Sequence, residues 1–175
     1  MPATGGPRIG VYPDPARIFR PGDRPDRASS YCGSMTQPTP GQQQVIDGIL
    51  AGGTAGFDSI LGLQYTAISP DGVEATLTLR PELHQPFGIT HGGVYCAIVE
   101  SVASVSGVVW LGGTGHVVGV NNNTDFLRAL SSGVLSIRST PIHRGRRQQL
   151  WLVEIDSEDG KAVARGQVRL QNIDA

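Results

Sequence analysis

A short polar motif opens a long apolar segment and contains the residue types that could do chemistry. The segment begins at His91-Gly92-Gly93, continues to about Leu111 without a Lys or Arg, and contains one acid, Glu100. Glycines let a ligand approach the backbone closely, and the first amides of a helix have no partner within that helix. The motif therefore offers hydrogen-bond donors for a polarised oxygen, together with a carboxylate that can accept a proton.

The length of this segment predicts a helix, because it is too long for an ordinary strand. Glu100 and Ser104 are four residues apart and share one helix face. A transmembrane helix is a poorer interpretation, because the run is short and contains an acid and three serines. Burying an ionised acid is costly unless it is paired, although Glu100 could also simply reach water. The other residues on the helix face of Glu100 and Ser104 are small: Gly93, Ala97 and Gly107.

The rest of the chain predicts an α+β fold in which a sheet must position this helix. Alternating or β-branched apolar residues between turn signals predict six strands. A short amphipathic helix is predicted at 43–50. The sheet needs cover for its apolar face and the chain offers one long helix, so we expect the sheet to wrap that helix. The predicted strands cover residues 61–68, 73–79, 117–126, 133–142, 150–156 and 162–171.

Composition narrows the class of protein and divides the chain. The 175 residues suffice for one domain with a sizeable core, and a net charge of −1 argues against a general nucleic-acid partner. Cys32 and Cys96 are far apart, so we expect free thiols, and without a signal pattern we expect a cytoplasmic protein. Residues 1–40 contain eight of the twelve prolines and predict an extended or disordered arm, or a strap over a partner subunit. Residues 41–175 are the predicted folded domain.

Three motifs in order resemble a known family. Gln85 lies six residues before His91-Gly92-Gly93, Glu100 and Ser104 follow, and His143-Arg144-Gly145-Arg146 comes later. The set resembles hotdog-fold acyl-CoA thioesterases of the PaaI-like type, and within it the aryl-CoA and 1,4-dihydroxy-2-naphthoyl-CoA hydrolases. The resemblance covers roughly residues 43–172. It implies an antiparallel sheet of about six strands around one central helix, in a homodimer that often forms a dimer of dimers.

The resemblance also implies roles for the residues of the first two motifs. The amide of Gly92, or less favourably that of Gly93, would polarise the thioester carbonyl, and Gln85 would orient it. Glu100 would attack as a nucleophile or activate water as a general base. Ser104 would hold Glu100 or the water, and His91 would cap the helix or hydrogen-bond the thioester. Each residue also has a structural interpretation, such as close packing for the glycines and a bond to its own backbone for Ser104.

Two further groups are implied to bind an aryl- or medium-chain acyl-CoA. One resembles the strand that lines the acyl and pantetheine pocket, and it could equally be an ordinary core strand: Asn123, Asp125, Phe126, Leu127 and Arg128. The other would bind the CoA phosphates, since guanidinium groups bind phosphate bidentately, or would form a solvated turn: His143, Arg144, Gly145, Arg146, Arg147 and Gln148. CoA is part of the substrate, so no separate cofactor is expected. The four histidines lack metal-ligand spacing, so no metal is expected.

The spacing of these residues argues against a site completed by one chain. Gly92 and Glu100 are eight residues apart, or about 12 Å along a helix. An oxyanion donor and an attacking group that share one carbonyl lie roughly 7 Å apart. We therefore expect two antiparallel chains, with the glycine end of one helix facing Glu100 of the other. Two alternatives remain open: a non-catalytic acyl-CoA binding or sensing module, and a structural oligomer whose arm recruits another protein.

Overall fold

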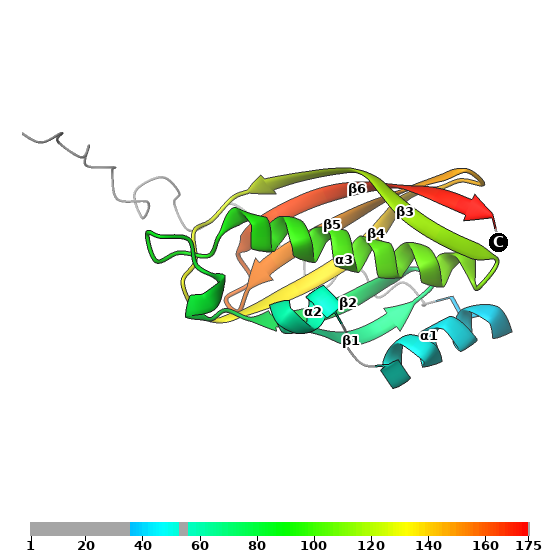
Figure 1. Cartoon of the computed structure of the whole chain (residues 1–175), viewed down its shortest axis with the longest axis horizontal. Helices are drawn as coiled ribbons and strands as arrows, with labels where there is room; N and C mark the ends of the chain where they lie inside the picture. Colours follow the sequence, from blue (N-terminus) through cyan, green and yellow to red (C-terminus); the bar gives the residue numbers. More distant parts are fainter. Residues whose placement is uncertain (1–35, 53–55, 175) are drawn as a thin grey trace, which may run out of the picture. The chain divides into compact units, whose positions relative to one another are not determined.

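The computed structural model describes residues 36–52 and 56–174. The predicted arm at 1–40 lies almost entirely outside these residues, as does Cys32. The described part contains helices α1 to α3, a short 3₁₀ helix and six strands (Figure 1). In chain order they are α1 (Pro40–Gly52), α2 (Gly56–Leu61), β1 (Leu63–Ser69), β2 (Gly72–Thr78), η3 (Pro81–Leu83), α3 (Gly92–Leu111), β3 (Gly115–Phe126), β4 (Val134–Arg144), β5 (Gln148–Ser157) and β6 (Ala162–Asp174).

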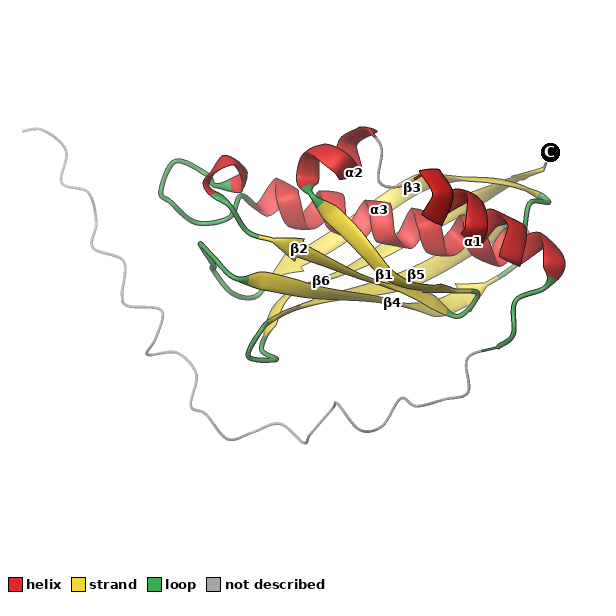
Figure 2. Ribbon diagram, turned by 90° about the horizontal axis from the view of Figure 1, so that it is seen from below, coloured by secondary structure: helices red, strands yellow, loops and turns green. Residues whose placement is uncertain are grey.

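The strands form one antiparallel sheet that curves around α3, as the sequence predicts for a hotdog fold (Figures 1 and 2). Their order is β1-β2-β4-β5-β6-β3. Alternate residues of the central strands face the helix; on β5 these are Trp151, Val153 and Ile155, all fully buried. This period of two places an apolar layer on the concave face.

The central helix forms because its apolar side is covered by this layer. Ile98, Val102 and Val109 are fully buried. The helix ends at Leu111 and is capped by Gly112, whose φ of 62° is left-handed and suits glycine. By length and composition α3 could cross a membrane, but a buried core helix has the same properties, and here α3 packs on the sheet. The opposite stripe, which contains Glu100 and Ser104, stays partly accessible in the isolated chain.

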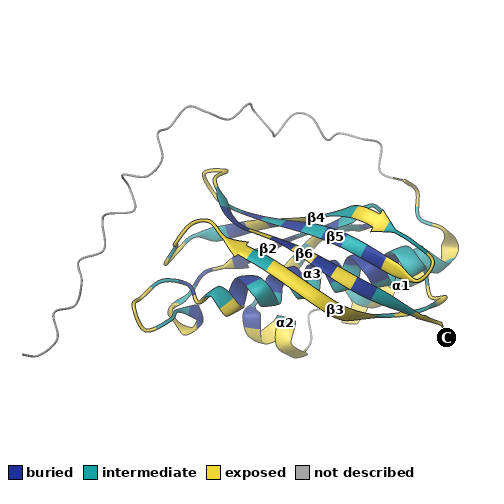
Figure 3. Cartoon of the chain, turned by 90° about the horizontal axis from the view of Figure 1, so that it is seen from above, coloured by how far each residue is buried: buried dark blue, intermediate teal, exposed yellow. Residues whose placement is uncertain are grey.

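Strand β3 is an edge of the sheet and is exposed along most of its length (Figure 3). Val118 and Val120 are 43% and 52% exposed although both are apolar. A bulge between Gly119 and Asn121 interrupts its pairing with β6. A long, exposed edge strand offers unpaired backbone groups to another chain.

The structure corrects the expected elements at two points. Residue 61 was expected to begin a strand, but Leu61 ends helix α2, whose Asp58 accepts hydrogen bonds from Tyr65 at 2.7 Å and Ser101 at 2.5 Å. These tertiary contacts stabilise a helix too short to form alone. Residues 143–149 were expected to be a connection, but β4 and β5 continue to within three residues of each other. The Asn172 side chain donates to two carbonyls of that tight turn at 3.0 Å each.

Candidate functional site

The N-terminus of α3 is organised by His91. Its Nδ1 accepts the Gly93 amide at 2.8 Å, so Nε2 carries the proton in the neutral ring and points away as a donor. A Cβ at position 93 would lie 2.8 Å from Nδ1, so any other residue there would require the His91 ring to shift. The cap uses the Gly93 amide and leaves the Gly92 amide without an acceptor within the described part of the chain.

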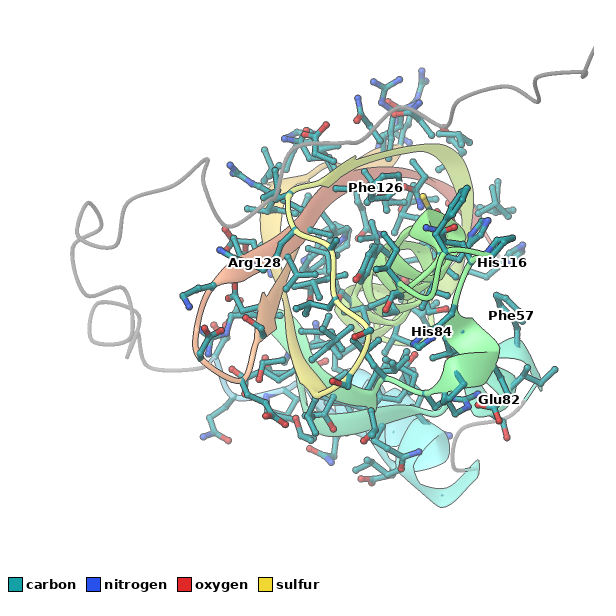
Figure 4. All side chains as sticks on the ribbon, turned by 90° about the vertical axis from the view of Figure 1, so that its left-hand side faces the viewer. Phe57, Glu82, His84, His116, Phe126 and Arg128 are labelled. Atoms are coloured by element: carbon teal, nitrogen blue, oxygen red, sulfur yellow. The ribbon has the colours of Figure 1, made fainter. Side chains whose placement is uncertain are left out.

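A cavity of about 330 Å³ lies beside this free amide and brings together five of the residues that the sequence singles out. They are Gln85, Gly92, Phe126, Leu127 and Arg128, and the cavity is completed by Ile89, Thr90, Tyr95 and Ala129. Figure 4 views the molecule from this end, with Phe126 and Arg128 labelled.

Two contacts shape the wall of this cavity. The Phe126 ring lies so close to Gly92 that a Cβ there would be 2.8 Å from the ring, so close packing is one reason for this glycine. The Gln85 Oε1 accepts the Phe87 amide at 3.0 Å, which leaves the Gln85 side-chain NH₂ group able to donate into the cavity.

The loop that carries Gln85 is fixed to the segment after β3. Thr90 donates through both its amide and its hydroxyl to the Leu130 carbonyl, at 2.7 and 2.9 Å. A ring nitrogen of His84 lies 2.8 Å from the Ser131 carbonyl oxygen. The cavity walls are therefore tied together on both sides before any ligand binds.

Glu100 lies half-buried in the middle of α3, against the edge strand. Its Oε2 accepts from the Asn122 side-chain amide at 2.9 Å, and its Oε1 lies over Gly119, where a side chain would collide with it. Ser104 makes no hydrogen bond to Glu100 within the described residues. The carboxylate is thus held by β3, and sequence reasoning missed Asn122 as its partner.

Within one chain, Glu100 and Gly92 are separated along the same helix. Eight residues of α3 correspond to about 12 Å. The site shared between two chains therefore stays a prediction.

The predicted substrate-binding residues of β3 are divided between the two faces of the strand. Phe126 faces α3, where its ring lies 6.1 Å from that of Tyr95, and Thr124 packs on the same side near Gly166. Asn123 and Asp125 alternate with these and line a second cavity of about 210 Å³, together with Arg165 and Gln167. Strand β3 therefore presents its predicted substrate-binding residues on two separate faces of the sheet.

The β4–β5 hairpin lies at the other end of α3. Arg144 Nη1 donates to the Pro70 carbonyl at 2.9 Å and to Asp71 at 3.2 Å, and its guanidinium lies 6.0 Å from the centre of the Trp110 ring. Hydrogen bonds from Thr36, followed by Arg144, hold the pKa of Asp71 below its usual value. Arg144 therefore has local partners.

The other predicted phosphate-binding side chains of the hairpin are accessible. Arg146 and Arg147 are exposed, and their guanidinium groups make no hydrogen bond to the described residues. His143 is also exposed, and Gln148 donates to Gln171 at 3.2 Å. Gly145 allows the His143 ring to fold over the turn, since a Cβ there would lie 2.5 Å from Nε2.

Comparison with known sequences gives consistent matches. Residues 87–164 match the model of the thioesterase superfamily. A Mycobacterium tuberculosis protein named "Putative esterase Rv1847" is 58% identical over 125 residues, which are 70% of this chain and 89% of that protein. The 1,4-dihydroxy-2-naphthoyl-CoA hydrolase of Escherichia coli K12 is 32% identical over 116 residues, 66% of this chain and 85% of that protein.

Solved structures of related proteins have a similar fold. The structure of the mycobacterial protein superimposes with a TM-score of 0.67, covering 68% of this chain and 97% of that one. A Haemophilus influenzae thioesterase is 35% identical, with a TM-score of 0.66 over 69% of this chain and 85% of that one.

Proposed function

The chain belongs to the thioesterase superfamily and is a thioester hydrolase, and we propose that its substrate is an aryl- or medium-chain acyl-CoA, cleaved to the free acid and CoA. One observation carries this proposal. The His91 imidazole accepts a hydrogen bond from the Gly93 amide, and the Gly92 amide stays free beside the cavity.

The thioester carbonyl would bind at the Gly92 amide. The amide lies at the positive end of the α3 dipole, where a developing oxyanion is stabilised. The free NH₂ group of Gln85, which lines the same cavity, would donate to the same oxygen. The Nε2–H of His91 would be a further donor in the proposed site, although His91 does not line the cavity of the single chain.

Glu100 would supply the attack by one of two routes. As a general base it takes a proton from water while the oxygen adds to the carbonyl carbon; the C–S bond then breaks and the thiolate leaves as CoA. As a nucleophile it adds directly and expels the thiolate, giving an anhydride that water hydrolyses. The hydrogen bond from Asn122 supports both routes, because it fixes the direction of the carboxylate.

The active unit would be a homodimer with two sites. The 12 Å separation of donor and acid along one helix requires a second chain. The exposed edge β3 is a suitable place for that chain, because no described strand pairs with its outer edge and Val118 and Val120 are exposed. Arg146 and Arg147 would then bind the CoA phosphates, since their guanidinium groups are accessible.

Replacing Glu100 tests the proposal. We expect Glu100→Ala and Glu100→Gln to lower kcat by about 10²- to 10⁴-fold, the usual loss when a general base is removed, while affinity for CoA is kept. Glu82→Gln, at an exposed acid outside the cavity, is the control and should hydrolyse normally. Thiol release would be followed over a panel of aryl and aliphatic CoA esters. Full activity in Glu100→Gln would reject the assignment, and a wild-type protein that binds acyl-CoA without releasing thiol would favour the non-catalytic module.

A further inference from the structure

The hydroxyl of Tyr95 is buried without a hydrogen-bond partner among the described residues. Tyr95 is 3% exposed and lies in the first turn of α3. Buried polar side-chain atoms nearly always have a partner, so an orphaned hydroxyl needs a specific explanation. In the described part of the chain this is the one side-chain oxygen or nitrogen in that condition.

No neighbour among the described residues makes a hydrogen bond of acceptable geometry to this hydroxyl. Thr90 lies close enough to interact with it and to act against the rise in its pKa, but the contact lacks hydrogen-bond geometry, and the Thr90 hydroxyl donates its own proton to the Leu130 carbonyl at 2.9 Å. Burial raises the pKa of Tyr95, so the phenol stays neutral and keeps its proton to donate. By contrast, the hydroxyl of Tyr65 is paired with Asp58 at 2.7 Å.

Position explains what the missing partner could be. Tyr95 is three residues after Gly92, and helix side chains lean towards the N-terminus, so its ring lies over the turn that contains the free amide. Tyr95 and Phe126 are in ring contact and both line the 330 Å³ cavity. A substrate held at Gly92 therefore passes beside this ring.

We propose that Tyr95 is a substrate-binding residue whose hydroxyl donates to an oxygen atom of the bound acyl-CoA. This inference rests on the proposed function for the class of ligand. The oxygen belongs either to the acyl group, as a hydroxyl or carbonyl substituent, or to an amide of the pantetheine arm. Because the hydroxyl is buried in the free chain, binding requires a neighbouring side chain to shift aside; the Phe126 ring, which contacts the Tyr95 ring and is 56% exposed, is the candidate. Substrates without a matching oxygen leave the hydroxyl unpaired and are disfavoured.

Tyr95→Phe removes this oxygen alone and separates the two sources. We would compare kcat/KM of the full-length variant and wild type on benzoyl-CoA and the three hydroxybenzoyl-CoA isomers. Loss of one neutral hydrogen bond lowers kcat/KM by about five- to tenfold. A loss confined to one hydroxylated ester assigns the partner to the acyl group, and an equal loss on all four assigns it to the pantetheine arm.

Stability in the absence of substrate distinguishes binding from a structural role. Because the hydroxyl is unpaired in the free protein, Tyr95→Phe should keep or raise the unfolding temperature. Tyr65→Phe, which breaks the bond to Asp58, should lower the unfolding temperature and leave the ratios between esters unchanged.

Two results would overturn the inference. One is kcat/KM within twofold of wild type on every ester; the other is a general loss of activity accompanied by a lower unfolding temperature. If wild type releases no thiol, the proposed hydrolysis fails separately. The dissociation constants of the four esters are then compared by calorimetry. Constants within twofold of wild type on every ester, or generally weaker binding with a lower unfolding temperature, would overturn the inference.

Discussion

The side-chain amide of Asn122 on β3 donates to the Glu100 carboxylate on α3 at 2.9 Å and to the Cys96 carbonyl at 3.1 Å. The edge strand and the central helix are therefore joined at the proposed attacking group. Gly119, three residues earlier on the strand, leaves room for the other carboxylate oxygen. Any partner chain that pairs along β3 would act directly on the position of Glu100.

Removing this hydrogen bond should impair turnover more than binding. We expect Asn122→Ala to lower kcat by about tenfold, the effect of losing one hydrogen bond to a charged group, with little change in KM. Asn121→Ala is the matched control, because its side chain is exposed at the adjacent bulge and does not contact Glu100. Steady-state kinetics of thiol release measure both. Equal kcat for the two variants would show that Glu100 needs no support from β3.

Two substitutions of His91 should affect protein stability and catalytic activity differently. His91→Ala loses the Nδ1 acceptor of the Gly93 amide, and we expect about 1 kcal/mol less stability, as for other lost N-caps, together with lower kcat. His91→Asn keeps a good N-cap oxygen but lacks the Nε2 donor, so stability should recover and kcat should not. Denaturant unfolding and thiol release test this. If His91→Asn keeps the wild-type kcat, the imidazole has no role in the reaction.

Asp71 should contribute stability that depends on pH. Its pKa is lowered in the folded state by hydrogen bonds from Thr36 and then by Arg144, so the folded protein favours the ionised form. The contribution is therefore present above the unfolded pKa, about 3.9, and is lost as pH falls through the lower folded pKa. Wild type should be more stable than Asp71→Asn at pH 7, and the difference should vanish in acid. A constant difference across pH would contradict this ionisation.

Apolar patterns and turn signals were enough to predict most of the fold. The apolar run after His91 predicted a helix to about Leu111, and alternating or β-branched residues between turn signals predicted all six strands, with shifted ends. Helix α2 was missed because it depends on Asp58 contacting Ser101 and Tyr65, which are distant in sequence.

The site was less predictable, because it depends on which way particular side chains point. The bulge after Gly119 sets the register of β3, and with it the inward position of Asn122 and the outward positions of Asn123 and Asp125. Alternation with Phe126 was the available signal for Asn122. Nothing in the local sequence indicated that Asp71 and Trp110 would hold Arg144.

The central claim is that each site combines Gly92 of one chain with Glu100 of another, and two inactive variants can test it together. Gly92→Pro removes the amide hydrogen, and proline suits the first helical position, where the extended His91 backbone (φ −67°, ψ 134°) already fits a residue before proline. Gly92→Ala adds a comparable Cβ near Phe126 but keeps the amide, so it is the matched control.

The measurement is thiol release after Gly92→Pro and Glu100→Gln chains are unfolded together and refolded. Half of randomly formed dimers are mixed, and each mixed dimer has one site with both groups intact, so about a quarter of wild-type activity should return. Neither variant refolded alone should be active. Failure of the mixture to exceed the separate variants, although mixed dimers are present, would contradict a site shared between two chains.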